Sequence, residues 1–290
     1  MAASSRPAAT APHAAPTAAA RSARRGSLAP RLSAFLIVHD EERHLGDCLA
    51  SLAGLADEIV VLDDGSADRT VAIARAAGAR VEHRPFDDFG RQKQAALELT
   101  RGDWVLSIDA DERVTPALAA EIRAIVGRDG GPNGYWVRRE LIYLGARLRF
   151  GGTGADWVLR LARRGAARFA PLPVHEHIEV DGRTARLRGT MLHLKYDTLA
   201  QHLATMDRYT SVIAERKRAR GARFHGWHLL RIVWELFARL VLRLGLLDGR
   251  AGVIHAAMAS FYAFLKYAKL WPDAPRPTPA PPPAVGGKER

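Results

Sequence analysis

The chain has 290 residues, of which 48% are hydrophobic and 26% are charged, so it is long enough to fold as one large or two small globular domains. Cys48 is the only cysteine, which excludes a disulfide framework and a cysteine-ligated zinc site and fits a reducing, cytoplasmic compartment. The net charge of +12 is uneven, since residues 208–271 hold 12 Lys or Arg against 3 Asp or Glu while residues 32–207 are nearly neutral. Such a basic region could face nucleic acid or an anionic membrane surface.

The two ends of the chain have compositions that do not favour folding. Residues 1–31 are mostly Ala, Pro, Ser and Arg, and they offer too little apolar surface to offset the entropy of ordering. They lack the apolar stretch of a secretory signal; an Arg-rich transit peptide or a bias of the genome both fit this composition. Residues 272–290 are rich in Pro. We expect both segments to be disordered.

Between these ends, short apolar runs alternate with helical patterns. Strands buried on both faces are predicted over 33–38, 58–62, 80–83 and 104–108, and helices over 45–52, 68–77, 91–100 and from 116 onward. Asp68 could cap the second helix and Gly78 could end it, while Thr115 and Pro116 are typical of an N-cap followed by a first helical position. This alternation predicts an α/β fold with a doubly wound, mostly parallel sheet in a domain over 32–197.

The pattern changes after this alternation. Residues 135–194 read as strands separated by Gly-containing turns, which suggests a mixed sheet, and residues 198–271 form a basic, helical region. There Arg231, Glu235, Arg239 and Arg243 recur every four residues among apolar side chains. No stretch reaches about 20 uninterrupted apolar residues, so a transmembrane span is not predicted. Either this region lies on a membrane surface, which we favour, or its helices pack on the sheet with their Arg residues solvated.

Acidic residues follow three of the predicted strands. They are Asp40-Glu41-Glu42 after the first strand, Asp63-Asp64 after the second, and Asp109, Asp111 and Glu112 after the fourth. Ligands bind at the carboxyl ends of the strands in an open parallel sheet. If the strand end is extended, Asp109 and Asp111 point the same way and could share Mg²⁺ or Mn²⁺, which would bridge to a diphosphate. The alternative for this short motif is a solvated turn or a helix cap.

The order of these motifs resembles a known family. The runs SAFLIVHDEERHL, ADEIVVLDDGSADRT and GDWVLSIDADERV resemble family 2 glycosyltransferases, which have the GT-A fold. The runs GADWVLRL and LDGRAGVIHAAMASFYAFLKYAKLW are similar to the bacterial subgroup that adds glucose to the inner core of lipopolysaccharide. The resemblance covers about residues 33–271.

The resemblance implies roles for individual residues. Those that would bind the donor are His39 and Glu41 at the nucleoside, Asp63 at the base, Lys93 near the diphosphate, and Asp109 and Asp111 at the sugar diphosphate and its metal ion. Asp156 matches the general base that takes a proton from the acceptor hydroxyl. Such enzymes invert the anomeric centre in a single displacement.

The function implied is transfer of a hexose, glucose in the subgroup, from a nucleotide diphosphate sugar such as a UDP-sugar, with Mg²⁺ or Mn²⁺ as cofactor. The acceptor would be the lipopolysaccharide core or another lipid-linked glycan, and the enzyme would be cytoplasmic and peripheral at the inner face of the membrane. A capsular or exopolysaccharide precursor is the alternative acceptor. A sugar nucleotidyltransferase would be expected to have a Gly-rich loop where this chain has His39 to Glu42. A nucleic-acid partner is not predicted, because the acidic loops would repel phosphate.

Three histidines and three departures from the family pattern complete the expectations. His175 and His177 would share one face of a strand, and His175 is a candidate third metal ligand or a residue that contacts the acceptor. His193 is interpreted as a hydrogen-bonded histidine in the core or at its rim. Asp40 and Gln94 stand where the family commonly has Asn, and the run FGGTGAD lacks the aromatic residues expected just before Asp156, so the acceptor pocket departs most from the family pattern.

Overall fold

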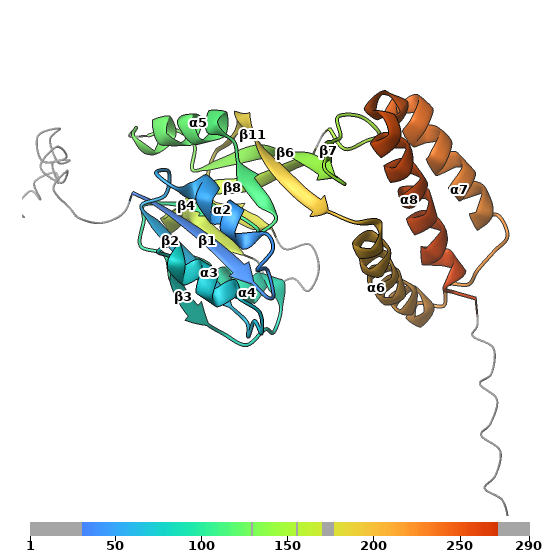
Figure 1. Ribbon diagram of the computed structural model, residues 1–290, viewed down its shortest axis with the longest axis horizontal. Helices are drawn as coiled ribbons and strands as arrows, with labels where there is room; N and C mark the ends of the chain where they lie inside the picture. The colour runs from blue at the N-terminus through green and yellow to red at the C-terminus, as the bar shows by residue number, and fades with distance from the viewer. Residues whose placement is uncertain (1–30, 129, 155, 170–176, 272–290) are drawn as a thin grey trace, which may run out of the picture.

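A computed structural model describes residues 31–128, 130–154, 156–169 and 177–271 (Figure 1). The first half of this part alternates strands and helices as predicted. The strands are β1 (Leu32–Val38), β2 (Glu58–Asp63), β3 (Arg80–His83) and β4 (Trp104–Ser107), and the helices between them are α2 (Leu45–Leu52), α3 (Thr70–Ala76) and α4 (Phe89–Glu98). These strands pair in the order β3-β2-β1-β4 and all run parallel. The carboxyl ends of β1, β2 and β4 therefore lie at one edge.

The second half extends the same sheet with mixed pairing. Its strands are β5 (Glu112–Val114), β6 (Gly134–Tyr143), β7 (Ala146–Arg147), β8 (Asp156–Arg163) and β11 (Thr184–Tyr196), with helix α5 (Pro116–Val126) after β5. The order continues from β4 through β8, β6 and β11 to β5, and β8 runs antiparallel to both of its neighbours. β9 (Ala167–Phe169) and β10 (Ile178–Val180) form a separate small sheet, after the short 3₁₀ turn η2 (Arg164–Ala166). The mostly parallel sheet with a mixed second half is confirmed.

The core occupies both faces of this sheet. Leu32, Ala34, Leu36 and Val38 alternate along β1 toward the face that α2, α3 and α5 cover. Phe35 points to the other face, where it packs with Ala96 and Leu97 of α4 and with Phe169 of β9. Because both faces are covered, the strands read as nearly continuous apolar runs in the sequence.

Local signals set several ends of the helices. Thr115 is the N-cap of α5 and accepts a hydrogen bond from the Leu118 N–H at 3.3 Å. Gly78 has φ +77°, a left-handed conformation that follows the last turn of α3. Asp68 is not the N-cap of α3, since Arg69 occupies that position. The Asp68 carboxylate accepts a hydrogen bond from the N–H of Thr70, the first residue of the helix. The helix therefore begins at Thr70.

The C-terminal part is helical, as predicted, and stands beside the sheet (Figure 1). It comprises α6 (Leu199–Ala219), α7 (His228–Phe237), the π-helical turn η3 (Ala238–Leu242), the 3₁₀ turn η4 (Gly245–Asp248) and α8 (Gly249–Ala268). Thr198 and Gln201 form a capping box at the start of α6, directly after β11. No helix in the described ranges has the length and apolar character that a membrane span requires.

Candidate active site

The loops after β1 and β2 are tied to each other at the carboxyl edge of the sheet. The Asp40 N–H donates to Ser66 Oγ at 3.0 Å, and the Glu41 N–H donates to Thr70 Oγ1 at 2.7 Å. Asp40 has φ +53°, a left-handed conformation that Asp and Asn adopt more readily than other residues with a side chain. The departure from Asn at this position therefore preserves the backbone conformation.

Asp63 ends β2 and is buried in its own turn. Its carboxylate accepts hydrogen bonds from the Gly65 N–H at 3.0 Å and from the N–H and hydroxyl of Ser66. Burial alone would raise the pKa of Asp63, but these hydrogen bonds outweigh it and lower the pKa. The side chain thus shapes the loop, and its predicted contact with a nucleobase stays a prediction.

His39 is exposed beside Asp63. Its Nδ1 hydrogen-bonds to the carboxylate of Asp64, which raises the pKa of His39. The imidazole therefore lies with its polar edge on the second acidic loop and its ring open to a ligand. Its predicted role at the nucleoside is compatible with this exposure and stays a prediction.

Asp109 follows β4 and lies between two cations. Lys93 of α4 places Nζ 3.2 Å from Asp109 Oδ1, and Arg160 of β8 donates from Nη2 to Asp109 Oδ2. Burial alone would raise the pKa of Asp109, but Arg160 and Lys93 outweigh it and hold the pKa well below its usual range. The structure thus places Lys93 and Arg160 against Asp109 and offsets the Asp109 charge within the protein, while the donor and metal roles predicted for Lys93 and Asp109 stay predictions.

The Asp109 to Glu112 segment is a turn, which corrects one expectation. The Glu112 N–H donates to the Asp109 carbonyl at 2.9 Å, so residues 109 and 111 are not on one face of an extended strand end. Instead, Asp111 Oδ2 lies 3.3 Å from His193 Nε2. His193 is on β11 and its side chain is 12% exposed, so this histidine belongs to the rim of the site rather than to the core.

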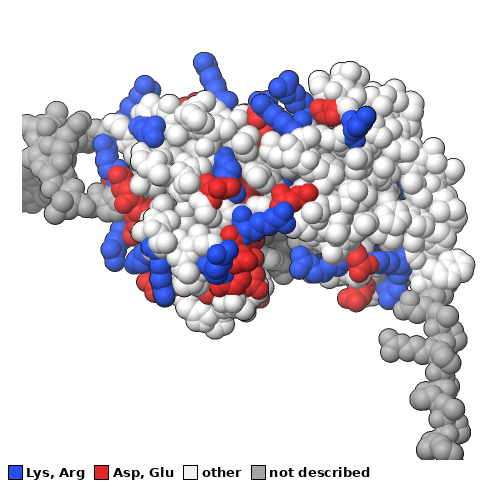
Figure 2. Space-filling model, viewed as in Figure 1, with Lys and Arg blue, Asp and Glu red and all other residues white. Residues whose placement is uncertain are grey.

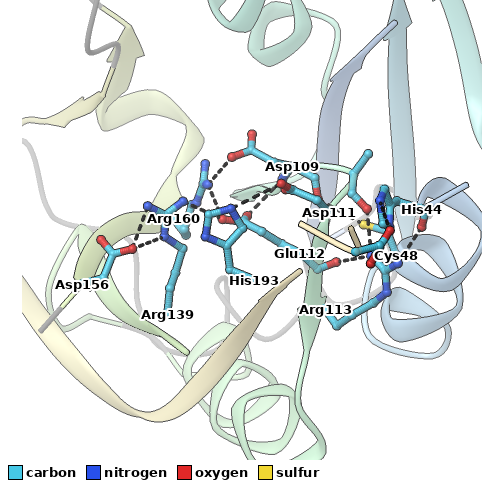
Figure 3. Close-up of polar contacts among 12 residues, drawn as sticks. His44, Cys48, Asp109, Asp111, Glu112, Arg113, Arg139, Asp156, Arg160 and His193 are labelled. Carbon is cyan, nitrogen blue, oxygen red and sulfur yellow. Dashed lines mark hydrogen bonds and ion pairs between the residues drawn. The ribbon is translucent and has the colours of Figure 1, made fainter. Parts of the chain in front are cut away.

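A buried ion-pair network joins Asp109 to Asp156 (Figure 3). Glu112 is fully buried, and its Oε1 accepts from Arg160 at 2.6 Å and from Arg139 of β6 at 3.1 Å. Arg139 in turn donates through Nε and Nη2 to Asp156 Oδ2, both at 2.9 Å. Among the described residues, three carboxylates, those of Asp109, Glu112 and Asp156, thus meet three cations, those of Lys93, Arg139 and Arg160, so that the charges of these six side chains balance.

The sequence reasoning gave no role to three members of this network. The sequence pattern places Glu112 in an acidic cluster without a role of its own, and it gives Arg139 and Arg160 no functional role. The available signal is weak: an Arg inside the apolar run that forms β8 must find a carboxylate partner or reach solvent. Which carboxylate it meets depends on the antiparallel pairing of β8 with β4 and β6, which the pattern does not specify.

Charge at the open side of the site is negative. Glu41 lies half-buried, and its burial together with the charges of Asp111 and Asp109 raises the pKa of Glu41 to about 7. Asp111 keeps 31% of its side chain exposed, and His193 is its one ion-pairing partner among the described residues. A cation placed against Asp111 would relieve this repulsion, and the adjacent carboxylate and imidazole are donors that Mn²⁺ accepts.

No cluster of three or more His, Cys, Asp or Glu in the part of the chain that the structure describes is arranged to hold a metal ion. His175, the predicted third ligand, lies outside the described residues. Of the two predicted aspartate ligands, the balanced charge of Asp109 favours Asp111 as the residue that would hold a cation.

Comparisons with known proteins identify the family of the chain. Residues 33–163 match the family described as Glycosyl transferase family 2. The lipopolysaccharide core biosynthesis glycosyltransferase LpsC of Rhizobium meliloti is 33% identical over 248 residues, which cover 83% of this chain and 92% of LpsC. A glycosyltransferase of Rickettsia typhi is 26% identical over 83% of this chain and 86% of its own length.

A solved structure of glucosyl-3-phosphoglycerate synthase from Mycobacterium tuberculosis, with Mn²⁺, uridine diphosphate and phosphoglyceric acid, is 21% identical. It superposes with a TM-score of 0.42, covering 71% of this chain and 82% of that protein. A likeness of this size does not place individual residues.

Proposed function

The chain belongs to glycosyl transferase family 2, and we propose that it moves a hexose from a UDP-sugar to a lipid-linked glycan of the lipopolysaccharide core. The enzyme class follows from the family and from the relative LpsC, whose name states its role in lipopolysaccharide core biosynthesis. The donor, the sugar and the acceptor are proposals. One observation supports a transfer reaction at this site most: the network through Arg160, Glu112 and Arg139 connects Asp109, which we assign to the donor side, to Asp156, which we assign as the base.

Asp156 has the properties that a general base for the acceptor needs. Its Oδ2 is fixed by both nitrogens of Arg139, and the side chain is 44% exposed. Its Oδ1 makes no hydrogen bond with the described residues, so this oxygen can accept a proton from an incoming hydroxyl. Arg139 therefore orients the carboxylate, and Glu112 shares the charge of Arg139.

The donor side uses a different set of residues. Lys93 and Arg160 offset the charge of Asp109, so this carboxylate would not repel a diphosphate leaving group that gains charge as its bond to the sugar breaks. Asp111, with His193 beside it, would hold a divalent cation. Such a cation, when bound, neutralises the growing charge on the diphosphate. Placing the base and the cation on opposite sides of the anomeric carbon favours an inverting displacement.

A nucleotide-sugar panel tests this function. The purified protein is mixed with UDP-glucose, UDP-galactose, GDP-mannose or ADP-heptose and with Mn²⁺ or Mg²⁺, and release of the nucleoside diphosphate is measured with and without deacylated core glycolipid. We expect UDP-sugar turnover that needs the cation. Asp111→Asn should abolish cation-dependent UDP binding, and Asp156→Asn should leave UDP binding intact while reducing transfer by about a hundredfold or more.

Asp103→Asn is the matched control, since Asp103 is exposed at the opposite end of β4. This variant should behave as the wild type in both measurements. If Asp111→Asn bound UDP with unchanged dependence on the cation, the assignment of the donor site would be wrong. If no nucleotide sugar were turned over with any acceptor, the proposed reaction would be wrong.

We also propose that the enzyme works at the surface of the inner membrane leaflet. Large apolar side chains along α7, η3 and η4 are exposed, including Leu230 (71%), Val233 (68%), Trp234 (61%) and Leu247 (66%). Figure 2 shows mostly uncharged side chains over the helical part. Arg231, Arg243 and Arg250 accompany them, a combination that suits an anionic lipid surface better than water. The apolar residues fit the interfacial depth of a bilayer rather than its full width.

Co-sedimentation with vesicles tests the membrane contact. The full chain should bind vesicles that contain phosphatidylglycerol more strongly than neutral ones, and the double substitution Leu230→Ser/Trp234→Ser should weaken binding at least tenfold. Phe86→Ser is the control, because Phe86 is a large apolar side chain that is also exposed (46%) but lies after β3, away from the C-terminal helices. Equal binding by the double variant and the wild type would contradict the proposed contact.

A further inference from the structure

A cavity of about 690 Å³ lies between the sheet and the C-terminal helices. Its walls come from the ends of β6 and β11 and from α6, α7 and α8. Its aromatic and basic lining residues include Tyr143, Lys195, Tyr196, Arg231, Trp234 and Lys266. None of them belongs to the ion-pair network of the active site, and the reaction proposed above assigns no role to the cavity.

Positive charge dominates the walls of the cavity. Among the described residues that line the cavity, Lys195, Arg231, Arg239 and Lys266 are cationic and one, Glu235, is acidic; its carboxylate already binds Arg239 at 2.7 Å. Lys195, Arg231 and Lys266 form no ion pair with a carboxylate of the described residues. Lys266 and Arg231 lie instead over aromatic rings, with Lys266 Nζ 4.9 Å from the centre of Tyr262 and the Arg231 guanidinium carbon 5.5 Å from that of Tyr267.

The electrostatics of the cavity support an anionic ligand. Burial, together with neighbouring cations, lowers the pKa of both Lys195 and Lys266. Burial also lowers the pKa of His202 and of His255 to about 4, so both imidazoles are neutral at pH 7. An anion between these cations would relieve their mutual repulsion. Phosphate and carboxylate are the groups that such ammonium and guanidinium donors bind most strongly.

The floor of the cavity is built from aromatic rings in fixed positions. Tyr196 stacks on His202 with ring centres 4.1 Å apart, and the Tyr143 hydroxyl hydrogen-bonds to His202 Nδ1 at 2.9 Å. A change of register after Leu194 places Tyr196 opposite Tyr143, so both rings reach the same region although β11 otherwise alternates. Ordered aromatic faces beside cations suit an anionic sugar, whose ring can lie against them.

The cavity and the active site share two strands. On β6, Arg139 holds Asp156 while Leu141 and Tyr143, on the same face, line the cavity. On β11, His193 contacts Asp111 while Lys195, two residues further on, lines the cavity. Residues two apart in a strand lie about 7 Å apart on one face, which is close to the width of one sugar ring. The cavity therefore begins about one monosaccharide from Asp156.

We propose that this cavity is the acceptor subsite and binds a phosphate or carboxylate on the sugar next to the one whose hydroxyl meets Asp156. The inference rests on the glycosyl transfer proposed above and adds the class of acceptor, an anionic glycan. Leu230 and Trp234 border the cavity and also belong to the exposed apolar surface of α7. A lipid-linked glycan could thus keep its lipid at that surface while its anionic group enters the cavity.

Steady-state kinetics of the full chain test the subsite. The donor is the nucleotide sugar that the panel identifies, and the acceptor is deacylated rough-type lipopolysaccharide that bears both phosphate and carboxylate. We expect Arg231→Gln and Lys266→Gln each to raise the acceptor KM about tenfold while the donor KM changes less than twofold. Arg216→Gln is the matched control, since Arg216 is an exposed cation on α6 outside the cavity. It should leave both constants unchanged.

Two chemically altered acceptors identify the anion. If the group is a phosphate, acceptor dephosphorylated with hydrofluoric acid should have the raised KM already, and Arg231→Gln should raise it no further. If the group is a carboxylate, carboxyl-reduced acceptor should instead have the raised KM, and Arg231→Gln should raise that KM no further. The proposal is overturned if transfer occurs but both variants keep the wild-type acceptor KM, or if only the donor KM changes. Absence of any transfer by the wild type would instead contradict the proposed function, and circular dichroism verifies that each variant is folded.

Discussion

Removal of Arg160 should expose how strongly the buried network depends on balanced charge. Arg160 is 6% exposed and binds both Asp109 and the fully buried Glu112. Arg160→Met leaves three carboxylates with two cations in the same space. Breaking a buried ion pair by removing one partner costs about 3–5 kcal/mol, and the remaining contacts of Lys93 and Arg139 favour the lower end. We therefore expect a loss of about 3 kcal/mol in the free energy of unfolding.

Urea unfolding followed by tryptophan fluorescence measures this loss. With a denaturant slope of roughly 3 kcal/mol per molar urea, the midpoint should fall by about 1 M. Arg101→Met is the control, since Arg101 is 68% exposed and its ion pair with Glu58 is long at 3.9 Å. Its effect should stay below about 0.5 kcal/mol. The deficit of Arg160→Met should also shrink as the pH falls below about 4, because Asp109 then binds a proton in the unfolded chain but not in the wild-type fold, where Arg160 lowers its pKa; the stabilisation due to that shift is therefore lost progressively.

A double-mutant cycle decides whether charge balance is the cause. Glu112→Gln alone leaves two carboxylates with three cations, whereas Arg160→Met/Glu112→Gln restores two against two. The double variant should therefore lose at least about 1.5 kcal/mol less than the sum of the single losses. Losses that add within about 0.5 kcal/mol would refute the reasoning, because they would mean that the two side chains stabilise the fold independently.

Three further predictions concern other parts of the chain. The pKa of Glu41 is raised to about 7 from an ordinary value near 4.5, so its contribution to stability is full below pH 4.5 and is lost as the pH rises through 7. The free energy of unfolding of Glu41→Gln, relative to that of the wild type, should therefore rise by about 1–2 kcal/mol between pH 5 and pH 8. Urea unfolding with a chelator present measures this difference. Gly189→Ala should destabilise the fold by about 1–3 kcal/mol in thermal unfolding, because the added Cβ would lie 2.5 Å from Leu118 Cα in α5. Gly165→Ala is the control and should be nearly neutral, because no atom lies within 4 Å of the Cβ that it adds. Thr198→Ala should cost about 1 kcal/mol by removing the N-cap of α6, and an unchanged melting temperature would show that the capping box adds nothing to stability.

Much of the sheet follows from the order of residues along the chain. The runs Leu32–Val38 and Glu58–Asp63 are buried on both faces, so their apolar character is continuous and survives in the sequence as a readable signal. Caps and stops such as Thr115 and Gly78 are local as well, since each acts on the backbone within a few residues. The position of the acidic loops at one edge then follows from the parallel arrangement.

The geometry of the Asp109 motif did not follow in this way. An extended strand end and a turn are both compatible with Asp-Ala-Asp, and the choice is made by the bond from the Glu112 N–H to the Asp109 carbonyl. That bond is stable because Glu112 is held by Arg139 and Arg160, which come from strands 27 and 48 residues further along the chain. Contacts over such separations leave no periodic signal.

By itself, then, the sequence determined the alternating sheet, the helical C-terminal part, the three acidic loops and the likeness to family 2 glycosyltransferases, because each of these depends on local pattern or on ordered motifs. The tertiary structure alone decided which carboxylates are neutralised and which stay open: Asp109 lies between Lys93 and Arg160, while Asp111 faces His193. It also decided that basic and aromatic residues of α7, α8 and β11 line one cavity, which shares strands β6 and β11 with Arg139 and His193 of the site. The reason is physical, since charge balance and cavities depend on distances between side chains that only the packed fold sets.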